Sequence, residues 1–190
     1  MKTFKESGLE FRFDDNWEVY QLDKEADYRE KINRQIPETK SIDFIGFNHT
    51  KNILLFVEVK SLRGYGNRTN IQRLTGENDD ITVEVAQKVR DSLAVIIGGA
   101  RNSTNLPDTW KKYVDHISQK KNLKVIAWVE LDVSTENFLD RAKANMNVRK
   151  QALRKRLTWL TSDVQILNTK NYNNDIEGME VSIAKPWFSL

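Results

Sequence analysis

The stretch Lys40–Ser61, KSIDFIGFNHTKNILLFVEVKS, decides the fold. Two apolar runs, residues 42–47 and 53–59, flank a polar break rich in asparagine. Both runs contain many β-branched and aromatic residues, which favour strands, and the break has the composition of a turn. The stretch therefore predicts a β-hairpin.

Each strand of the predicted hairpin carries charge, Asp43 in the first and Glu58 and Lys60 in the second. Side chains alternate between the faces of a strand, so Glu58 and Lys60 share one face, while Val57 and Val59 occupy the other. Charges are rare in apolar strands unless a metal ion, an opposite charge or water compensates them. The three residues are therefore candidates for a functional site. The alternative is an edge-strand charge pair, Glu58 with Lys60, and an acid beside a turn.

Composition limits the class of protein and the kind of metal site. A chain of 190 residues, 39% hydrophobic and 30% charged, predicts one soluble globular domain. The net charge is only +3, so any nucleic-acid surface must be local. The absence of cysteine excludes disulfides and thiolate ligands. With only His49 and His116, a metal would be bound by oxygen, which favours Mg²⁺ or Mn²⁺.

The sequence predicts a cytoplasmic protein. Its N-terminus, MKTFKESGLE, lacks the apolar core of a signal peptide. Its longest apolar run, Leu93–Ala100, is far shorter than the roughly 20 residues that a membrane span needs.

Helical and strand patterns alternate through the rest of the chain. We expect strands at 9–13, 17–20, 124–131 and 164–168, helices at 21–36, 81–97, 107–121 and 135–160, and a long loop at 62–80. This order predicts an α/β fold in which helices flank a central mixed β-sheet on both faces.

Two helices carry finer expectations. In the helix at 21–36, Glu25 lies near the middle of the apolar stripe, while Asp27 and Glu30 point away from it. The helix at 81–97 is expected to end at Gly98 and Gly99, because glycine commonly follows the last turn of a helix.

Asp43, followed after fourteen intervening residues by Glu58-Val59-Lys60, resembles the active-site signature of the PD-(D/E)xK nuclease superfamily. The resemblance implies the restriction-endonuclease-like fold in a single domain, 1–190. Its core maps onto residues 21–131, with a basic helix and a strand at 135–170 added to it. Ile42 replaces the proline that often precedes the first acid of the signature.

The same resemblance implies metal-dependent hydrolysis of phosphodiester bonds, in DNA. Asp43, Glu58 and the Val59 carbonyl would hold Mg²⁺ or Mn²⁺. Lys60 would position or deprotonate the attacking water and offset phosphate charge. Glu25 would supply a carboxylate that contacts these ligands or binds a second metal ion.

Gln87 matches a helix position at which many superfamily nucleases carry glutamine or a basic residue near the site. It reaches the site if its helix face meets the hairpin. If that face meets solvent, Gln87 has no special role.

Basic residues could bind a nucleic-acid backbone at two places. One group, from the helix at 135–160, is Arg149, Lys150, Arg154, Lys155 and Arg156; the other, after the Glu-x-Lys strand, is Arg63, Arg68 and Arg73. No carboxylate occurs from Arg141 to Ser162, which favours phosphate binding over an ordinary solvated face. Trp110, Trp128 and Trp159 are expected to lie in the interior and not in a stacking surface.

Two alternatives to a nuclease remain open. One is a catalytically silent nucleic-acid-binding module on the same fold. The other is a protein-interaction domain of a larger defence or mobile-element system. Many superfamily enzymes cut both strands as homodimers, but no coiled-coil seam in the sequence predicts one here.

Overall fold

The computed structural model describes residues 1–63, 80–131 and 136–184. In chain order, its elements are β1 (Lys2–Glu6), β2 (Leu9–Phe13), β3 (Trp17–Gln21), the 3-10 turn η1 (Leu22–Lys24), the short helix α1 (Ala26–Tyr28), the π-helical turn η2 (Arg29–Asn33), β4 (Phe44–Asn48), β5 (Ile53–Ser61), α3 (Asp80–Asn102), α4 (Pro107–Ser118), β6 (Leu123–Glu130), α5 (Glu136–Leu157), β7 (Val164–Leu167) and β8 (Met179–Ile183).

The central sheet has five strands in the order β3-β4-β5-β6-β7. The first two pairings are antiparallel and the last two are parallel, so the sheet is mixed. The predicted hairpin is β4–β5, in which Phe44 pairs with Val57 and Asn48 with Ile53. The predicted α/β class with a central mixed sheet and flanking helices is confirmed.

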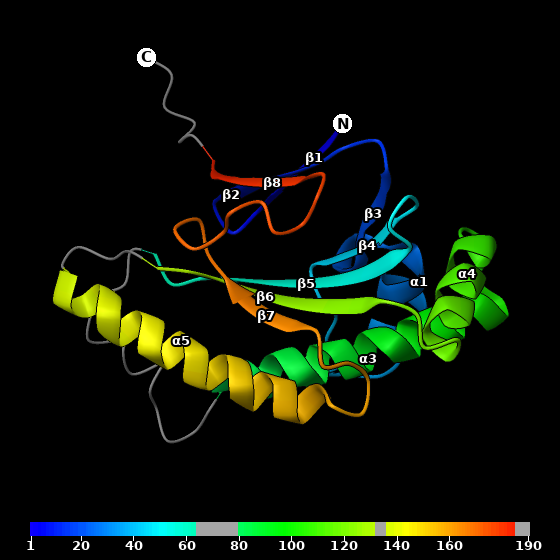
Figure 1. The fold of residues 1–190 in the computed structure, drawn as a ribbon. Helices are drawn as coiled ribbons and strands as arrows, with labels where there is room; N and C mark the ends of the chain where they lie inside the picture. The colour runs from blue at the N-terminus through cyan, green and yellow to red at the C-terminus, as the bar shows by residue number, and fades with distance from the viewer. Residues whose placement is uncertain (64–79, 132–135, 185–190) are drawn as a thin grey trace, which may run out of the picture.

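The sheet is covered on both faces, as Figure 1 shows. Helices α3 and α5 lie beneath it, and α4 lies at one end. A second sheet, of order β1-β2-β8, lies over the opposite face, where helices were also expected. Strands β1 and β8 have no clear signal in the sequence, because β1 has mostly exposed residues and β8 pairs with β2 from the far end of the chain.

Each face of the central sheet has its own hydrophobic core. Toward the helices, buried side chains of β4, β5 and β6 pack against α3, α4 and α5, among them Phe56 and Trp110. Toward the small sheet, Phe44, Val57 and Trp128 pack against β2 and β8. Full burial of such a side chain stabilises the fold by about 1.5–3 kcal/mol. Any charge on β4 or β5 therefore lies in apolar surroundings and needs a partner.

The expected continuous helix at 21–36 is wrong. It is divided into η1, α1 and η2, and Glu25 interrupts it with an extended backbone, φ −70° and ψ 138°. Glu25 consequently does not lie on a helical stripe. The deeply buried acid is Asp27, 3% exposed, which accepts hydrogen bonds from Lys31, Ser103 and Trp110.

Helix α3 also differs from expectation, because it continues through Gly98 and Gly99 to Asn102. A Cβ on Gly99 would lie 2.4 Å from a ring carbon of Trp110. Gly99 therefore allows α4 to pack closely against α3, and it does not end the helix.

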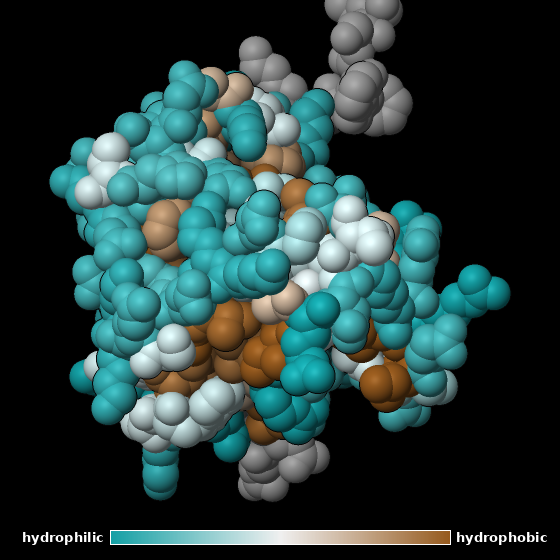
Figure 2. Space-filling model, turned by 90° about the vertical axis from the view of Figure 1, so that its right-hand side faces the viewer, coloured by the Kyte–Doolittle hydropathy of each residue, from teal (hydrophilic) through white to brown (hydrophobic). Residues whose placement is uncertain are grey.

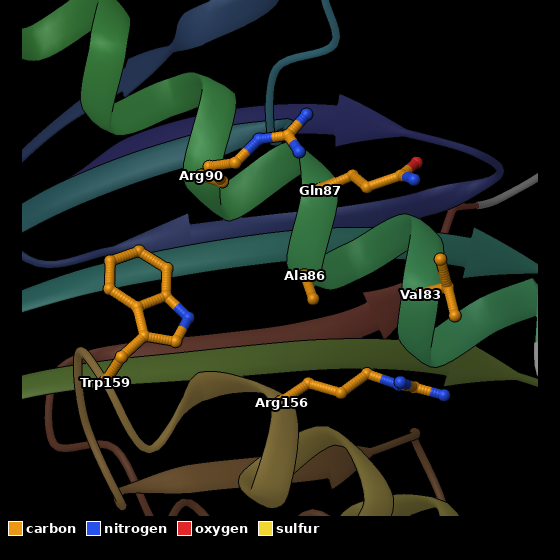
Figure 3. Close-up of a pocket in the computed structure, with 6 residues that line it drawn as sticks. All are labelled: Val83, Ala86, Gln87, Arg90, Arg156 and Trp159. Carbon is orange, nitrogen blue, oxygen red and sulfur yellow. The ribbon is translucent and has the colours of Figure 1, made fainter.

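The surface is largely hydrophilic on the face seen in Figure 2, with hydrophobic residues gathered in its lower half. A hollow of about 600 Å³ lies between α3 and the end of α5, lined by Val83, Ala86, Gln87, Arg90, Arg156 and Trp159 (Figure 3). Among the helices of the described residues, none combines the length and apolar character needed to cross a bilayer.

Candidate active site

The register of the hairpin brings the two acids together. Asp43 directly precedes β4, so it lies one residue beyond the last pair of the ladder, Phe44 with Val57, on the side of Glu58. Glu58 belongs to the face covered by α3, where it contacts Lys88. Asp43 lies where β5 continues to Ser61 beyond the start of β4, and its Oδ2 accepts the Val59 N–H.

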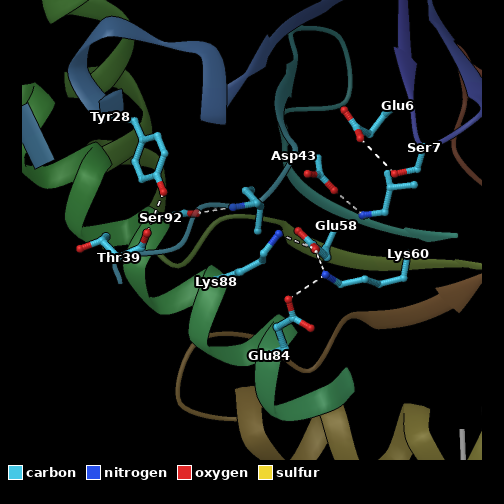
Figure 4. Close-up of polar contacts among 12 residues, drawn as sticks. Glu6, Ser7, Tyr28, Thr39, Asp43, Glu58, Lys60, Glu84, Lys88 and Ser92 are labelled. Atoms are coloured by element: carbon cyan, nitrogen blue, oxygen red, sulfur yellow. Dashed lines mark hydrogen bonds and ion pairs between the residues drawn. The ribbon is translucent and has the colours of Figure 1, made fainter. Parts of the chain in front are cut away.

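Lys60 joins this group from the same strand. Its Nζ lies 3.0 Å from Oε1 of Glu58, and Val57 and Val59 are buried in the opposite core, as alternation along the strand predicts. Figure 4 shows Asp43, Glu58 and Lys60 converging between the sheet and α3. Glu58 is 1% exposed and Lys60 24% exposed, so the cluster extends from the interior to solvent.

Helix α3 supplies two further charged residues that were not among those predicted from the sequence. Lys88 Nζ lies 2.6 Å from Oε1 of Glu58, and Glu84 Oε1 lies 2.8 Å from Nζ of Lys60. Residues four apart in a helix lie on one face, so Glu84 and Lys88 reach the same group.

The same face of α3 also holds the segment that leads into Asp43. The Ile42 backbone N–H donates to Oγ of buried Ser92 over 3.0 Å, and the Lys40 N–H donates to Oδ2 of Asp91 over 3.1 Å. Polar residues at positions 84, 88, 91 and 92, beside the apolar Val85 and Val89, form a periodic signal in the sequence. That signal could have identified this face.

Burial and charge raise the pKa of Asp43 to about 7, with burial the largest cause and the neighbouring Glu58 carboxylate the next. The Lys88 ammonium and a hydrogen bond from the Val59 N–H to Oδ2, 2.6 Å long, act in the opposite direction. Glu6, from the end of β1, adds to the rise. Two acids share one poorly solvated site, so a proton or a cation is needed between them.

The charge of Lys60 is fixed by its partners. Burial works to lower its pKa, but the carboxylates of Glu58 and Glu84 raise it on balance. For Glu84, burial works to raise the pKa, but Lys60 lowers it on balance. Lys60 is therefore an ammonium at neutral pH, which favours positioning water and offsetting charge over accepting a proton.

The donor set fits a divalent cation. Oε2 of Glu58 is buried with no hydrogen-bond partner among the described residues. In a strand, the N–H and C=O of one residue point to the same side, so the Val59 carbonyl lies on the Asp43 side of β5. Two carboxylates and a carbonyl are oxygen ligands of the kind that Mg²⁺ takes. Within the described ranges, no group of three or more histidines and acids forms a metal centre.

Glu25 takes no part in this cluster. Burial raises the pKa of its carboxyl, and Asp27 adds to that effect; Glu25 in turn raises the pKa values of Tyr20 and Tyr113. The charges that act on Asp43 are those of Glu58, Lys88 and Glu6. The broken backbone at Glu25 explains why it does not face the site as expected.

Gln87 is also separate from the cluster. Its side chain is exposed and lines the hollow between α3 and α5, on a different side of α3 from Lys88 (Figures 3 and 4). The open question about its helix face is thus answered in favour of solvent. The next residue, Lys88, is the one that contacts Glu58.

The structure describes all of the predicted nucleic-acid-binding residues except two. Arg154, Lys155 and Arg156 are exposed near the end of α5, whereas Arg149 and Lys150 are half-buried. Arg63 is the second residue after β5, and Arg68 and Arg73 lie outside the described residues.

Comparison with known proteins identifies no relative of this chain, since no family model, curated protein or solved structure matches it.

Proposed function

We propose that the protein is a metal-dependent nuclease that hydrolyses phosphodiester bonds, in DNA, with the PD-(D/E)xK arrangement that its sequence resembles. The observation that carries this proposal is the gathering of three charges at the start of β4: Asp43 accepts the Val59 N–H and is acted on by the Glu58 charge, and Lys60 lies 3.0 Å from Glu58. The raised pKa of Asp43 and the unpartnered Glu58 oxygen support it, because both would be relieved by a cation.

The roles of the residues follow from their surroundings. Asp43, Glu58 and the Val59 carbonyl would hold Mg²⁺ or Mn²⁺. The bound ion would supply a water of lowered pKa and polarise the phosphate. Lys60, charged and partly exposed, would orient that water and offset charge on the phosphate. Glu84 would fix the Lys60 ammonium, which it contacts at 2.8 Å.

Plasmid nicking tests the proposal. Wild type should nick supercoiled DNA with Mg²⁺ or Mn²⁺ and not with EDTA. Asp43→Asn and Lys60→Met should lose at least about a hundredfold in rate, on the order expected when a residue acting directly in the reaction is removed. Gln87→Ala is the matched control on α3 and should keep wild-type activity. Cleavage that persists at the wild-type rate in Lys60→Met would overturn the proposal.

A catalytically silent nucleic-acid-binding module is the second candidate, and one observation favours it. Lys60 and Lys88 already neutralise Glu58 and Glu84 within the cluster, so the fold compensates most of the charge without a metal. Such a module would bind DNA without cutting it, and neither Asp43→Asn nor Lys60→Met would change its affinity. We propose a cytoplasmic location for either activity.

A further inference from the structure

Trp159 is a large hydrophobic side chain left exposed at the end of α5. It is 59% exposed, although the sequence predicted an interior position. The turn after α5 is closed by hydrogen bonds from the Leu160 and Thr161 N–H groups to the Leu157 carbonyl, both 2.8 Å. Leu160 packs against the core from this turn. The indole is therefore directed outward by a fixed backbone.

Trp159 lies between two surface hollows. On one side is the hollow between α3 and α5, where Trp159 shares the lining with Arg90 and Arg156 (Figure 3). On the other side is a hollow of about 570 Å³, whose lining includes Lys120 and Lys121. A flat aromatic side chain with space on both sides offers a stacking surface.

Cations surround the indole. We call Arg90, Lys120, Lys121, Lys155 and Arg156 the cationic collar; all five are exposed, and Lys155 lies one helical turn before Trp159. Among the described residues that line the two hollows, the single acid is Asp163, which is already paired with Lys124. Arg90 also contacts Asp91 over 2.8 Å, but cations outnumber acids around Trp159, which favours an anionic ligand.

We propose that Trp159 and the cationic collar bind single-stranded nucleic acid, with a base stacked on the indole and phosphates on the collar. Exposed aromatic residues bordered by basic side chains bind unpaired bases in a sequence-tolerant and salt-sensitive way. A duplex keeps its bases stacked inside and offers the indole no free base face. An acidic protein could contact the cations of the collar, but it has no base that would stack on the indole in the two hollows.

Fluorescence anisotropy with labelled oligonucleotides of about 15 nucleotides tests this site, in EDTA so that cleavage does not enter. Wild type should bind single strands more tightly than the duplex of the same sequence. Trp159→Ala should weaken single-strand binding about tenfold or more, and Trp159→Tyr should retain most of it. Lys2→Ala, a change at an exposed cation of β1, should bind as wild type does, and the presence of EDTA separates binding at this site from the proposed reaction.

The controls keep the result interpretable. Ile183→Ala removes an exposed hydrophobic side chain from β8, on the opposite face of the central sheet, and should leave binding unchanged. Lys155→Glu should weaken binding without touching the ring, and thermal melting should show all variants folded. Three results would overturn the proposal: unchanged binding in Trp159→Ala, equal affinity for duplex and single strand, or no binding by wild type at low salt. Binding of polyglutamate in place of the oligonucleotides would assign the collar to an acidic protein partner.

Discussion

At the scale of single residues, the stability of the site depends on how the charges between β5 and α3 are balanced. Asp43 and Glu58 repel each other in poorly solvated surroundings, and Lys60 and Lys88 offset that repulsion only in part. The cluster is stable as it stands because each ammonium contacts a carboxylate. The same balance makes its stability sensitive to protons and cations.

Stability should fall as pH rises in metal-free solution, because of Asp43. Its pKa is about 7 in the folded protein and near 3.8 in the unfolded chain. The folded state thus binds more protons between these values, and the stability from the neutral carboxyl is lost as pH rises through 7. Between pH 5 and pH 8, the loss should be about 2–3 kcal/mol. Urea unfolding in EDTA measures it.

Asp43→Asn should remove this pH dependence, since its amide can still accept the Val59 N–H and carries no charge. Asp108→Asn, a change at an exposed acid of α4, should keep the wild-type slope. If wild type and Asp43→Asn showed the same slope between pH 5 and pH 8, the shared-charge description of the site would be wrong.

Among the helix residues at the site, Lys88 should contribute most to the stability of the metal-free protein. Lys88→Met leaves the buried Glu58 with one cation fewer and should cost about 2–3 kcal/mol in metal-free buffer. Added Mg²⁺ should restore part of that loss in proportion to its occupancy. Gln87→Met, one residue away but exposed, should stay within about 0.5 kcal/mol of wild type. Chemical denaturation with equal midpoints for Lys88→Met and Gln87→Met would contradict this assignment.

At the scale of elements, α3 organises the molecule. One of its faces carries the side chains that hold the hairpin and its lead-in segment. Further along, Gly99 lets Trp110 of α4 approach the helix backbone. The position of α4 therefore depends on a missing Cβ, while the position of Asp43 depends on polar groups of the same helix.

Two adjacent glycines of α3 provide a matched test. Gly99→Ala would place a Cβ within 2.4 Å of Trp110 and should destabilise the protein by about 1–3 kcal/mol. Gly98→Ala meets only Ile32 at 3.9 Å and should be neutral or stabilising by up to about 1 kcal/mol, because alanine favours a helix. Thermal unfolding of the two variants compares them directly. A more stable Gly99→Ala would refute close packing of α3 and α4.

At the scale of the whole molecule, charge is distributed unevenly although the net charge is only +3. The cluster between β5 and α3 combines three acids with two lysines, whereas exposed cations without a neighbouring acid in the sequence lie along the end of α5. Binding of a nucleic-acid backbone should therefore depend on where a charge is removed, and not on the net charge alone.

Charge reversal tests this distribution. The double variant Arg154→Glu and Lys155→Glu should bind DNA more weakly and lower the slope of log affinity against log salt by about 1 for each lost phosphate contact. Lys2→Glu with Lys111→Glu gives the same net charge from exposed residues of β1 and α4, and should change the slope little. Anisotropy titrations over a range of salt compare them; equal slopes would locate the nucleic-acid surface elsewhere.

The sequence by itself determined the α/β class, the β4–β5 hairpin and the common face of Glu58 and Lys60, because these follow from local periodicity and from the alternation of side chains along a strand. Only the tertiary structure decided what meets that face. Lys88 and Glu84 reach it through helix packing, and Gln87 and Glu25 do not, because helix rotation and a broken backbone set their directions. The same is true of the small sheet and of Trp159, since strand pairing across the chain and core filling by Leu160 depend on contacts that no local pattern encodes.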